Sequence, residues 1–320
     1  MRGELLKAVH PFTARAAESV SAWGETRLIT AISRWLGAAN PRAPRGIGDD
    51  CAVLRPALRP QLLTVDSVLY GRHFDSRLPP RAAGAKLLKR NLSDLAAMGG
   101  RPTAAVVALC LDGRVRRQWL EGFYRGLAAC ARRHHVAIVG GDIAQADGGL
   151  AASLTLLGTV AGPRALTRTG GRPGDHLYVT GVLGGSVRSG HHHAFQPRLA
   201  EGAWCARRPE VRAMIDLSDG LAKDAPALCP PGTAPALFAA ALPRREGASL
   251  AAALTEGEDY ELAFAVAARA DRPAFERAWR RAFPRVRLSW IGRLTRRGEL
   301  PPDALVLGDF RGFEHLRRAR

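Results

Sequence analysis

Aspartate residues beside glycine, or at the ends of apolar runs, are the first residues of this sequence that suggest chemistry. The segment Gly46-Ile47-Gly48-Asp49-Asp50 places two carboxylates on a glycine-flanked turn. Further aspartates follow in comparable settings: Asp66, Asp94, Asp142, Asp216 and Asp219. Carboxylates that converge repel one another unless cations neutralise them, and hard oxygen ligands suit Mg²⁺, which proteins often bind together with substrate phosphates. We therefore expect a magnesium-nucleotide site assembled from separated loops.

The segment from Asn91 to Gly99 supports this expectation more strongly than an isolated aspartate does. Asn91 and Asp94 lie one helical turn apart near the end of an expected helix that Gly99 terminates. A carboxylate near the negative end of the helix dipole gains nothing structurally. A residue that destabilises its own helix, with no structural contact to explain it, is typical of a functional position.

The strongest local indication of a functional site is the segment Asp216-Leu217-Ser218-Asp219-Gly220-Leu221. Its two aspartates and one serine follow an apolar strand, and Gly220 opens an expected helix, where anions bind favourably. A helix N-cap explains one of these side chains but does not explain both aspartates. Gly140-Gly141-Asp142 also follows an expected strand, although an ordinary turn accounts for that tripeptide equally well.

Other polar clusters are less specific. Glu258, Asp259 and Glu261 surround Tyr260 just before an apolar strand, and we interpret this cluster as the polar lip of a site. Arg168 lies between two threonines and could contact a phosphate, although one arginine in so arginine-rich a chain predicts little. Three adjacent histidines cannot all face one ion on a regular element, so we expect residues 191–193 to form a solvated loop.

Hydrophobic periodicity indicates the elements that must position these residues. It predicts helices at residues 25–36, 80–98 and 114–134, and strands at residues 51–54, 62–65, 103–111, 136–139 and 150–160. Alternating strands and helices resume between residues 177 and 291, after Gly162-Pro163. We therefore predict a loosely held extension (1–22), an N-terminal domain (23–162) and a C-terminal domain (163–320), in an α/β (α+β) fold.

Composition excludes several classes of protein. The net charge of +18 is spread along the chain and is not gathered in a patch, which argues against nucleic-acid binding. No apolar run approaches the ~20 residues of a membrane span, and residues 1–20 lack a secretory pattern. The five cysteines are scattered without a CxxC pair, so we expect no zinc site, no disulfide framework and a cytoplasmic protein. The P-loop, Rossmann and nucleophile-elbow motifs are absent.

Taken in order, these motifs resemble those of the thiamine-monophosphate kinase family, in the superfamily that includes aminoimidazole ribonucleotide (AIR) synthetase. The resemblance runs from about Gly24 to Phe313. It is also carried by Thr64-Val65-Asp66, by Gly71 to Phe74, by Leu166-Thr167-Arg168 and by Pro173-Gly174-Asp175.

This resemblance implies an ATP-dependent kinase that converts thiamine phosphate to thiamine diphosphate, with Mg²⁺ as its metal. It implies an AIR-synthetase-like fold in which an N-terminal mixed-sheet domain binds ATP and Mg²⁺ and pairs with its copy in a homodimer. A C-terminal α/β domain would complete each protomer. The expected reaction is direct in-line phosphoryl transfer, which depends on positioning and electrostatics and needs no enzyme nucleophile.

The resemblance also assigns roles to individual residues. The implied metal ligands are Asp50, Thr64, Asp66, Asp94, Asp142, Asp216 and Asp219. ATP would be contacted by Tyr124, Gly141, Asp142, Arg168 and Ser218, and the thiamine end by His73, Glu258 and Phe313. The residues expected to carry catalysis are Asp50, Asp66, Asp94, Arg168 and Asp216.

The sequence departs from the family pattern in three places, one of which is a region between Gly185 and Met214 that is shorter than usual, and it leaves other functions open. Val65 stands where the family often has threonine or serine, and Ile143-Ala144 replaces a usual hydroxyl pair. The principal alternative is another ATP-dependent enzyme of the superfamily that acts on a different small phosphorylated substrate. No cysteine precedes Asp49, as a selenophosphate synthetase would require, and the chain lacks the cysteine-bearing tail of a hydrogenase-maturation dehydratase. A non-catalytic nucleotide sensor and an arginine-rich nucleic-acid binder are alternatives of another class.

Overall fold

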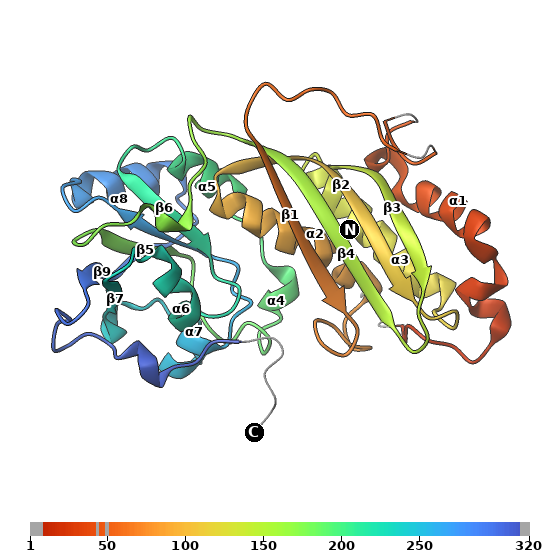
Figure 1. Ribbon diagram of the computed structural model, residues 1–320. Helices are drawn as coiled ribbons and strands as arrows, with labels where there is room; N and C mark the ends of the chain where they lie inside the picture. The colour runs from red at the N-terminus through yellow and green to blue at the C-terminus, as the bar shows by residue number, and fades with distance from the viewer. Residues whose placement is uncertain (1–8, 43–44, 49–50, 314–320) are drawn as a thin grey trace. The chain divides into compact units, whose positions relative to one another are not determined.

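The computed structural model describes residues 9–42, 45–48 and 51–313, and the chain divides into two compact units (Figure 1). Unit 1 comprises the chain up to Leu92 together with Pro102–Thr159. Unit 2 comprises Ser93–Arg101 and the chain from Val160 onward. The predicted division at residues 162 and 163 treated 23–162 as one continuous piece, whereas residues 93–101 group with unit 2.

A four-stranded sheet forms the centre of unit 1 (Figure 1). Its strands are β1 (Gln61–Leu69), β2 (Gly100–Leu111), β3 (Ala137–Gln145) and β4 (Leu150–Val160), in the order β1-β4-β2-β3. β1 runs antiparallel to β4, and β3 runs parallel to β2, so the sheet is mixed as expected. Buried and half-buried residues alternate along β4, which shows that one face of the sheet packs on a core.

Among the described residues, three helices accompany this sheet. They are α1 (Gly24–Leu36), α2 (Pro80–Ala97), which ends in unit 2, and α3 (Arg117–Arg133), and all three agree with the predicted helices to within a few residues. Of these, α1 packs against α3. α2 and α3 approach closely because Gly84 has no side chain. A Cβ atom there would lie 1.9 Å from the carbonyl oxygen of Phe123, so any larger residue would separate the two helices.

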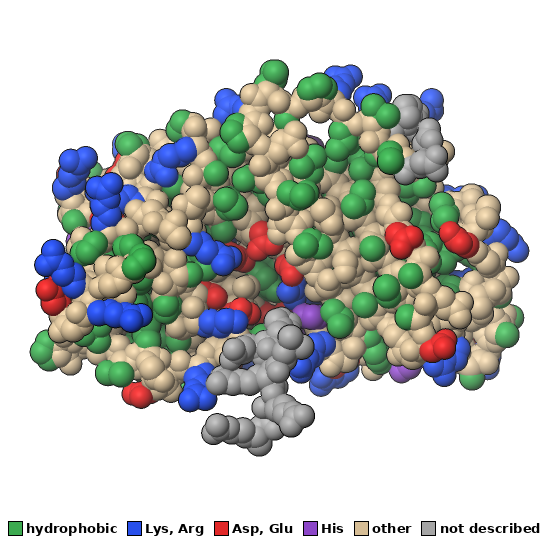
Figure 2. Space-filling model, viewed as in Figure 1, with side chains coloured by type: hydrophobic (Ala, Val, Ile, Leu, Met, Phe, Trp, Pro, Cys, Tyr) green, Lys and Arg blue, Asp and Glu red, His purple; other side chains and the backbone are tan. Residues whose placement is uncertain are grey.

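The opposite, open face of the sheet carries hydrophobic side chains. Leu63 is 71% exposed and Val65 is 62% exposed, and Leu69 and Val106 are exposed on the same face. Figure 2 shows hydrophobic side chains spread over this part of unit 1. An exposed apolar sheet face of this kind is typical of an interaction surface.

The N-terminal segment 9–22 is attached to unit 1. It contains two short 3₁₀ helices, η1 (Ala16–Glu18) and η2 (Val20–Ala22). The backbone N–H of Thr13 donates to the carbonyl of Arg114 at 2.9 Å, and that of Val20 donates to the carbonyl of Val115 at 2.8 Å. The prediction of a loosely held extension is therefore wrong for these residues, because backbone hydrogen bonds to a distant loop cannot be read from local periodicity.

The loop after β2 is held by Asp112, which gives a test of stability against pH. Its carboxylate accepts hydrogen bonds from the guanidinium and backbone N–H of Arg114 and from the backbone N–H of Gly148. Hydrogen bonds from Arg114, before any other cause, hold the pKa of Asp112 well below its ordinary value. The carboxylate therefore stabilises the fold above the unfolded-state pKa of about 4, and this contribution is lost as the pH falls through the folded-state pKa.

We expect Asp112→Asn to lower the melting temperature at pH 7, because the amide cannot accept all of these donors. The difference from the wild type should shrink as the pH falls below about 4, because the unfolded wild-type chain then takes up a proton that the folded carboxylate still excludes. Thermal unfolding followed by circular dichroism between pH 2 and 8 measures it. A difference that stays constant over this range would contradict the assigned role.

A five-stranded antiparallel sheet forms the centre of unit 2 (Figure 1). Its strands are β5 (His176–Thr180), β6 (Val211–Asp216), β7 (Thr233–Leu237), β8 (Leu262–Val266) and β9 (Leu288–Arg296), in the order β6-β8-β5-β9-β7. Its helices are α4 (His191–Ala194), α5 (Leu199–Cys205), α6 (Leu221–Asp224), α7 (Leu250–Thr255) and α8 (Arg272–Ala282).

Both faces of this second sheet are buried. Leu177 and Val179 of β5 belong to one hydrophobic cluster, and the intervening Tyr178 belongs to another cluster that contains Trp279 of α8. β8 is buried along its whole length because both faces of the sheet are covered. A strand in this position has a continuous apolar sequence, without alternation. This rigid core supports the loops that follow β6 and precede β8.

The strand predicted at residues 51–54 is not formed. The described segment from Cys51 to Pro56 is irregular, and Val53 and Leu54 are 58% and 46% exposed. An apolar run forms a strand only if a neighbouring strand accepts its hydrogen bonds, and such pairing lies beyond a local pattern. Among the described residues, no helix is long and apolar enough to cross a membrane.

Candidate active site

Asp66 provides the carboxylate of unit 1 that faces the helices. It lies in β1 opposite the fully buried Leu154 of β4, so its side chain projects from the covered face of the sheet. There Nη2 of Arg90, on α2, donates to Oδ1 of Asp66 at 3.0 Å, and both side chains are largely buried. Thr64, two residues earlier on the strand, lies on the same face and is partly buried. A guanidinium therefore neutralises this carboxylate.

Asp142 lies on the other face of the same sheet. In the parallel pairing of β2 with β3 it lies opposite the exposed Ala108, and Asp142 is itself exposed. The preceding Gly141 packs so tightly that a Cβ atom would lie 2.0 Å from the carbonyl oxygen of Val107. Val65 is exposed on this face too, so the side chain at this position offers no oxygen atom there. Asp66 and Asp142 therefore project from opposite faces of the unit 1 sheet.

Asp216 and Ser93 form a buried carboxylate–hydroxyl pair in unit 2. Asp216 ends β6 and is 4% exposed, and Ser93 lies in the last turns of α2. The hydroxyl of Ser93 donates to Oδ2 of Asp216 at 2.8 Å. Asp94, the next residue of α2, is partly buried. Asp216 is therefore bonded to the chain neighbour of Asp94, although the two aspartates are separated by more than one hundred residues in sequence.

The loop after β6 carries Asp219 and gathers further groups around it. Nζ of Lys223 donates to Oδ2 of Asp219 at 2.6 Å and to the carbonyl oxygen of Phe313 at 2.6 Å. The backbone N–H of Phe313 donates to the carbonyl of Asp219 at 2.8 Å. Phe313, predicted to meet the thiamine end, therefore lies beside a predicted metal ligand. The backbone N–H of Asp219 also donates to the carboxylate of Asp224, and burial raises the pKa of Asp224 to about 6.

The acidic turn before β8 pairs with this same loop. The backbone N–H of Glu258 donates to the carbonyl of Ser218 at 2.8 Å, and that of Tyr260 donates to the carbonyl of Leu217 at 2.8 Å. The Tyr260 hydroxyl donates to Oε1 of Glu258 at 3.3 Å. Glu258 and Ser218, which the resemblance assigns to different substrates, are therefore neighbours in unit 2.

The remaining predicted residues are placed separately. Tyr124 of α3 is buried beside Trp35 and Phe123, and burial raises its pKa far above the ordinary value. Arg168 is exposed at the start of η4 (Arg168–Gly170). His73 lies in the turn after β1, where its ring nitrogen Nδ1 accepts from the backbone N–H of Leu69 at 3.1 Å. Asp50 lies outside the described residues.

Residues 191–193 do not form the predicted solvated loop. They form most of α4 and are partly buried. Nε2 of His191 bonds the carbonyl oxygen of Asp259 at 2.9 Å, and burial lowers the pKa of His191. This hydrogen bond joins segments that are distant in sequence, so the local sequence could not predict it.

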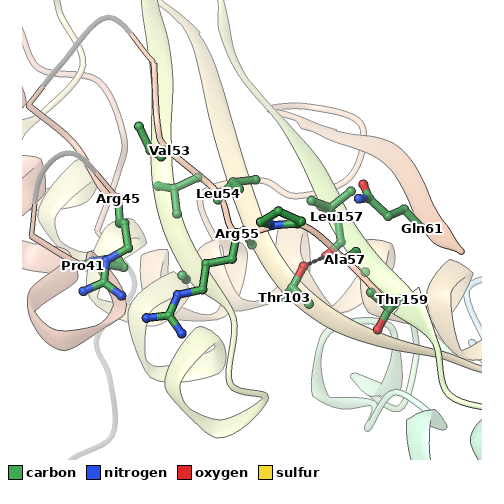
Figure 3. Close-up of a pocket in the computed structure, with 15 residues that line it drawn as sticks. Pro41, Arg45, Val53, Leu54, Arg55, Ala57, Gln61, Thr103, Leu157 and Thr159 are labelled. Carbon is green, nitrogen blue, oxygen red and sulfur yellow. Dashed lines mark hydrogen bonds between the residues drawn. The ribbon is translucent and has the colours of Figure 1, made fainter. Parts of the chain in front are cut away.

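A cavity of about 450 Å³ lies on the open face of unit 1 but contains none of the expected site residues (Figure 3). The segment around Val53 and Leu54 forms one side, together with Arg45 and Arg55. Among the described residues that line it, none is acidic. This cavity therefore offers no carboxylate for a cation.

The chemistry of the donors fits a hard divalent cation. In the part of the chain that the structure describes, no three His, Cys, Asp or Glu side chains are close enough together to hold a metal ion by themselves. Arg90 and Lys223 contact Asp66 and Asp219, so side-chain cations stand beside two carboxylates assigned to the metal. Scattered single carboxylates suit Mg²⁺, because Mg²⁺ retains waters and takes its other ligands from substrate phosphates.

Several residues of this region were missed by the sequence analysis. Ser93 adjoins Asp94 in the same motif, and that adjacency was the signal that could have found it. Lys223 follows Asp219 by four residues, a spacing at which side chains meet on a helix. Asp224 bonds the backbone of Asp219, and side-chain spacing does not indicate that contact. Asp259 lies in the acidic turn that the sequence analysis identified. The local sequence does not show that Asp259 is buried and bonded within the protein whereas Glu258 is not assigned such a role.

Comparisons with known proteins agree over most of the chain. The family model described as AIR synthase related protein, N-terminal domain, matches residues 48–160. A thiamine-monophosphate kinase of Rhodopirellula baltica is 37% identical over 248 residues, which cover 71% of this chain and 77% of that protein. The crystal structure of thiamine-monophosphate kinase from Stenotrophomonas maltophilia K279a is 30% identical with a TM-score of 0.71, over 83% of this chain and 93% of that one. A structure of AaThiL complexed with AMPPCP and TMP is 26% identical with a TM-score of 0.62, over 95% and 99%.

Proposed function

Since the chain belongs to the thiamine-monophosphate kinase family, we propose that it transfers the terminal phosphoryl group of ATP to thiamine phosphate, which yields thiamine diphosphate and ADP. The observation that carries this proposal is the similarity, over 95% of the chain, to a structure that holds AMPPCP, an ATP analogue, and TMP. The grouping of Asp216, Asp219 and Glu258 around paired loops of unit 2 supports it.

The proposed chemistry is an in-line displacement. An oxygen of the acceptor's phosphate attacks the γ-phosphorus of ATP, and the bond from that phosphorus to the bridging oxygen breaks, so that ADP leaves with the electron pair. The acceptor phosphate is largely ionised near neutral pH, so no general base is required. The chain's contribution is to hold two polyanions in line and to stabilise the charge that is shared among their oxygens.

We assign the carboxylates of both units to the metal. The proposed Mg²⁺ ligands of unit 1 are Asp66 and Thr64, and those of unit 2 are Asp94, Asp216 and Asp219. Asp142 would serve a separate metal position, because it projects from the other face of its sheet, and Asp50 completes the predicted set. When bound, Mg²⁺ would offset the negative charge of the two phosphate groups.

The polar residues outside this set would bind and orient the substrates. Arg168 is exposed and would contribute charge stabilisation at the phosphates. The further proposed ATP contacts are Gly141, Ser218 and Tyr124. Tyr124 is buried, so its part would be to pack beneath the residues that touch the nucleotide. His73, Glu258 and Phe313 would contact the thiamine end, where Phe313 offers an aromatic ring that is 40% exposed.

A homodimer and a cytoplasmic location complete the proposal. The exposed hydrophobic face of the unit 1 sheet, with Leu63 and Val65, would be covered by a second copy of the chain. The five cysteines are all free thiols, which supports a reducing compartment.

A product assay tests the function. The purified protein is incubated with ATP and Mg²⁺ and, in parallel, with thiamine phosphate, with thiamine and with phosphorylated purine-pathway intermediates. We expect ADP and thiamine diphosphate only in the first reaction, detected by chromatography, and no turnover after addition of EDTA until Mg²⁺ is restored. Turnover of a different phosphorylated acceptor, with thiamine phosphate inert, would favour the alternative of another enzyme of the superfamily.

A further inference from the structure

The turn that precedes β8 has an unusual backbone. Gly257, Glu258 and Tyr260 have φ values of +68°, +54° and +49°. The left-handed region is unfavourable for residues with a side chain, and two non-glycine residues occupy it within three positions. Such a conformation persists only if surrounding contacts enforce it.

Asp259, the residue between them, supplies those contacts. It is 1% exposed, and its carboxylate accepts from the backbone N–H of Gly184 at 3.0 and 3.1 Å and from the hydroxyl of Ser186 at 2.5 Å. Nη2 of Arg245 contributes a longer contact at 3.4 Å. Burial raises the pKa of Asp259 to about 6, so these donors offset a real cost of keeping the carboxylate inside the protein.

The turn that Asp259 holds is also bonded to the loop of Ser218. The backbone N–H groups of Glu258 and Tyr260 donate to carbonyls of that loop. Tyr260 stacks on Phe195 with ring centroids 4.0 Å apart, and its hydroxyl contacts the carboxylate of Glu258. Any shift of the turn therefore moves the Glu258 carboxylate.

We propose that Asp259 is a positioning residue, whose buried carboxylate holds the turn with Glu258 and Tyr260 in the left-handed conformation and thereby directs Glu258 toward the acceptor substrate. This inference rests on the proposed function, since it deepens the role given to Glu258. Asp259 itself is too buried to touch the substrate.

The first test compares Asp259→Asn with Asp175→Asn. Asp175 is a matched control, because it is also fully buried in unit 2 and accepts from backbone N–H groups and from Arg212, yet it contacts none of the residues assigned to the site. An amide at position 259 would place N–H groups against other donors. A misplacement of about 1 Å can cost roughly 100-fold, so we expect the KM for thiamine phosphate to rise by about tenfold or more in Asp259→Asn, with a much smaller change for ATP. Asp175→Asn should leave both KM values unchanged at a comparable loss of melting temperature.

A double-mutant cycle separates this inference from the role of Glu258. If Asp259 acts through Glu258, then Asp259→Asn should have little further effect on KM in a Glu258→Gln background, whereas independent effects would multiply. A raised KM in Glu258→Gln together with an unchanged KM in Asp259→Asn overturns the inference and leaves the proposed function intact. An unchanged KM in Glu258→Gln overturns the role of Glu258.

A readout that is independent of activity completes the test. Amide hydrogen exchange of Glu258 and Tyr260 should become faster in Asp259→Asn than in Asp175→Asn, because their hydrogen bonds depend on the held turn. Equal exchange rates in the two variants would overturn the inference, whether or not the protein turns over thiamine phosphate.

Discussion

Asp216→Asn should lower the turnover number for thiamine diphosphate formation by about 10³-fold, a loss typical of removing one group that stabilises transition-state charge. The amide has the shape of the carboxylate and keeps an oxygen that can accept from Ser93, whose hydroxyl lies 2.8 Å away. What the substitution removes is the negative charge, at a position that is 4% exposed and therefore poorly screened by solvent. The turnover number should therefore fall by orders of magnitude, whereas the melting temperature should change little.

Steady-state kinetics and thermal unfolding of the same preparation measure this difference. Asp175→Asn is again the control, since it removes a buried carboxylate of unit 2 that pairs with Arg212 outside the proposed site. The control should lose stability and retain turnover. Near-normal turnover in Asp216→Asn would show that this carboxylate does not serve the reaction.

Asp66→Asn should raise the Mg²⁺ concentration needed for half-maximal activity by about 100-fold or more, because removal of a group that merely supports a metal ligand already costs about 10–100-fold. The neutral amide binds a hard cation weakly. In addition, Arg90 would lose its counter-charge, so its guanidinium, 3.0 Å from the carboxylate in the wild type, would repel an approaching cation.

A titration of the initial rate with Mg²⁺ at saturating ATP and thiamine phosphate measures the shift. Asp112→Asn provides the matched control, because Asp112 is an arginine-paired aspartate of the same unit with no assigned role in the site. An unchanged Mg²⁺ requirement in Asp66→Asn would remove Asp66 from the metal ligands and leave Arg90 as its structural partner.

Much of the fold follows from local patterns. The apolar spacing of residues 25–36 and 114–134 predicts α1 and α3, since a helix buries one face with a period of 3.6 residues. The mixed sheet of the N-terminal half was expected from the family resemblance, because local alternation does not determine the direction in which strands pair. The irregular segment 51–56 shows where this reasoning fails, because an apolar run indicates burial or a strand only when other segments provide the partner.

The sequence predicted which types of residue would form the candidate site, but it predicted their arrangement in space only in part. Asp216 ends β6, as the apolar run before it predicted, and Asp94 lies near the end of α2, as the glycines after that helix predicted. The opposite orientations of Asp66 and Asp142 were not foreseen, because they depend on the register of two strands with their partners, and a shift of one residue would reverse each side chain.

From the order of residues alone follow the family, the two-domain α/β organisation and the set of acidic residues, since these depend on short motifs whose chemistry is local. The tertiary structure alone decides that Ser93 bonds Asp216, that Lys223 and Phe313 meet Asp219, and that Asp259 holds its turn through Gly184 and Ser186. The physical reason is the same in each case. A buried carboxylate must find donors to offset its lost hydration, and the packed fold supplies them from segments that are distant in sequence.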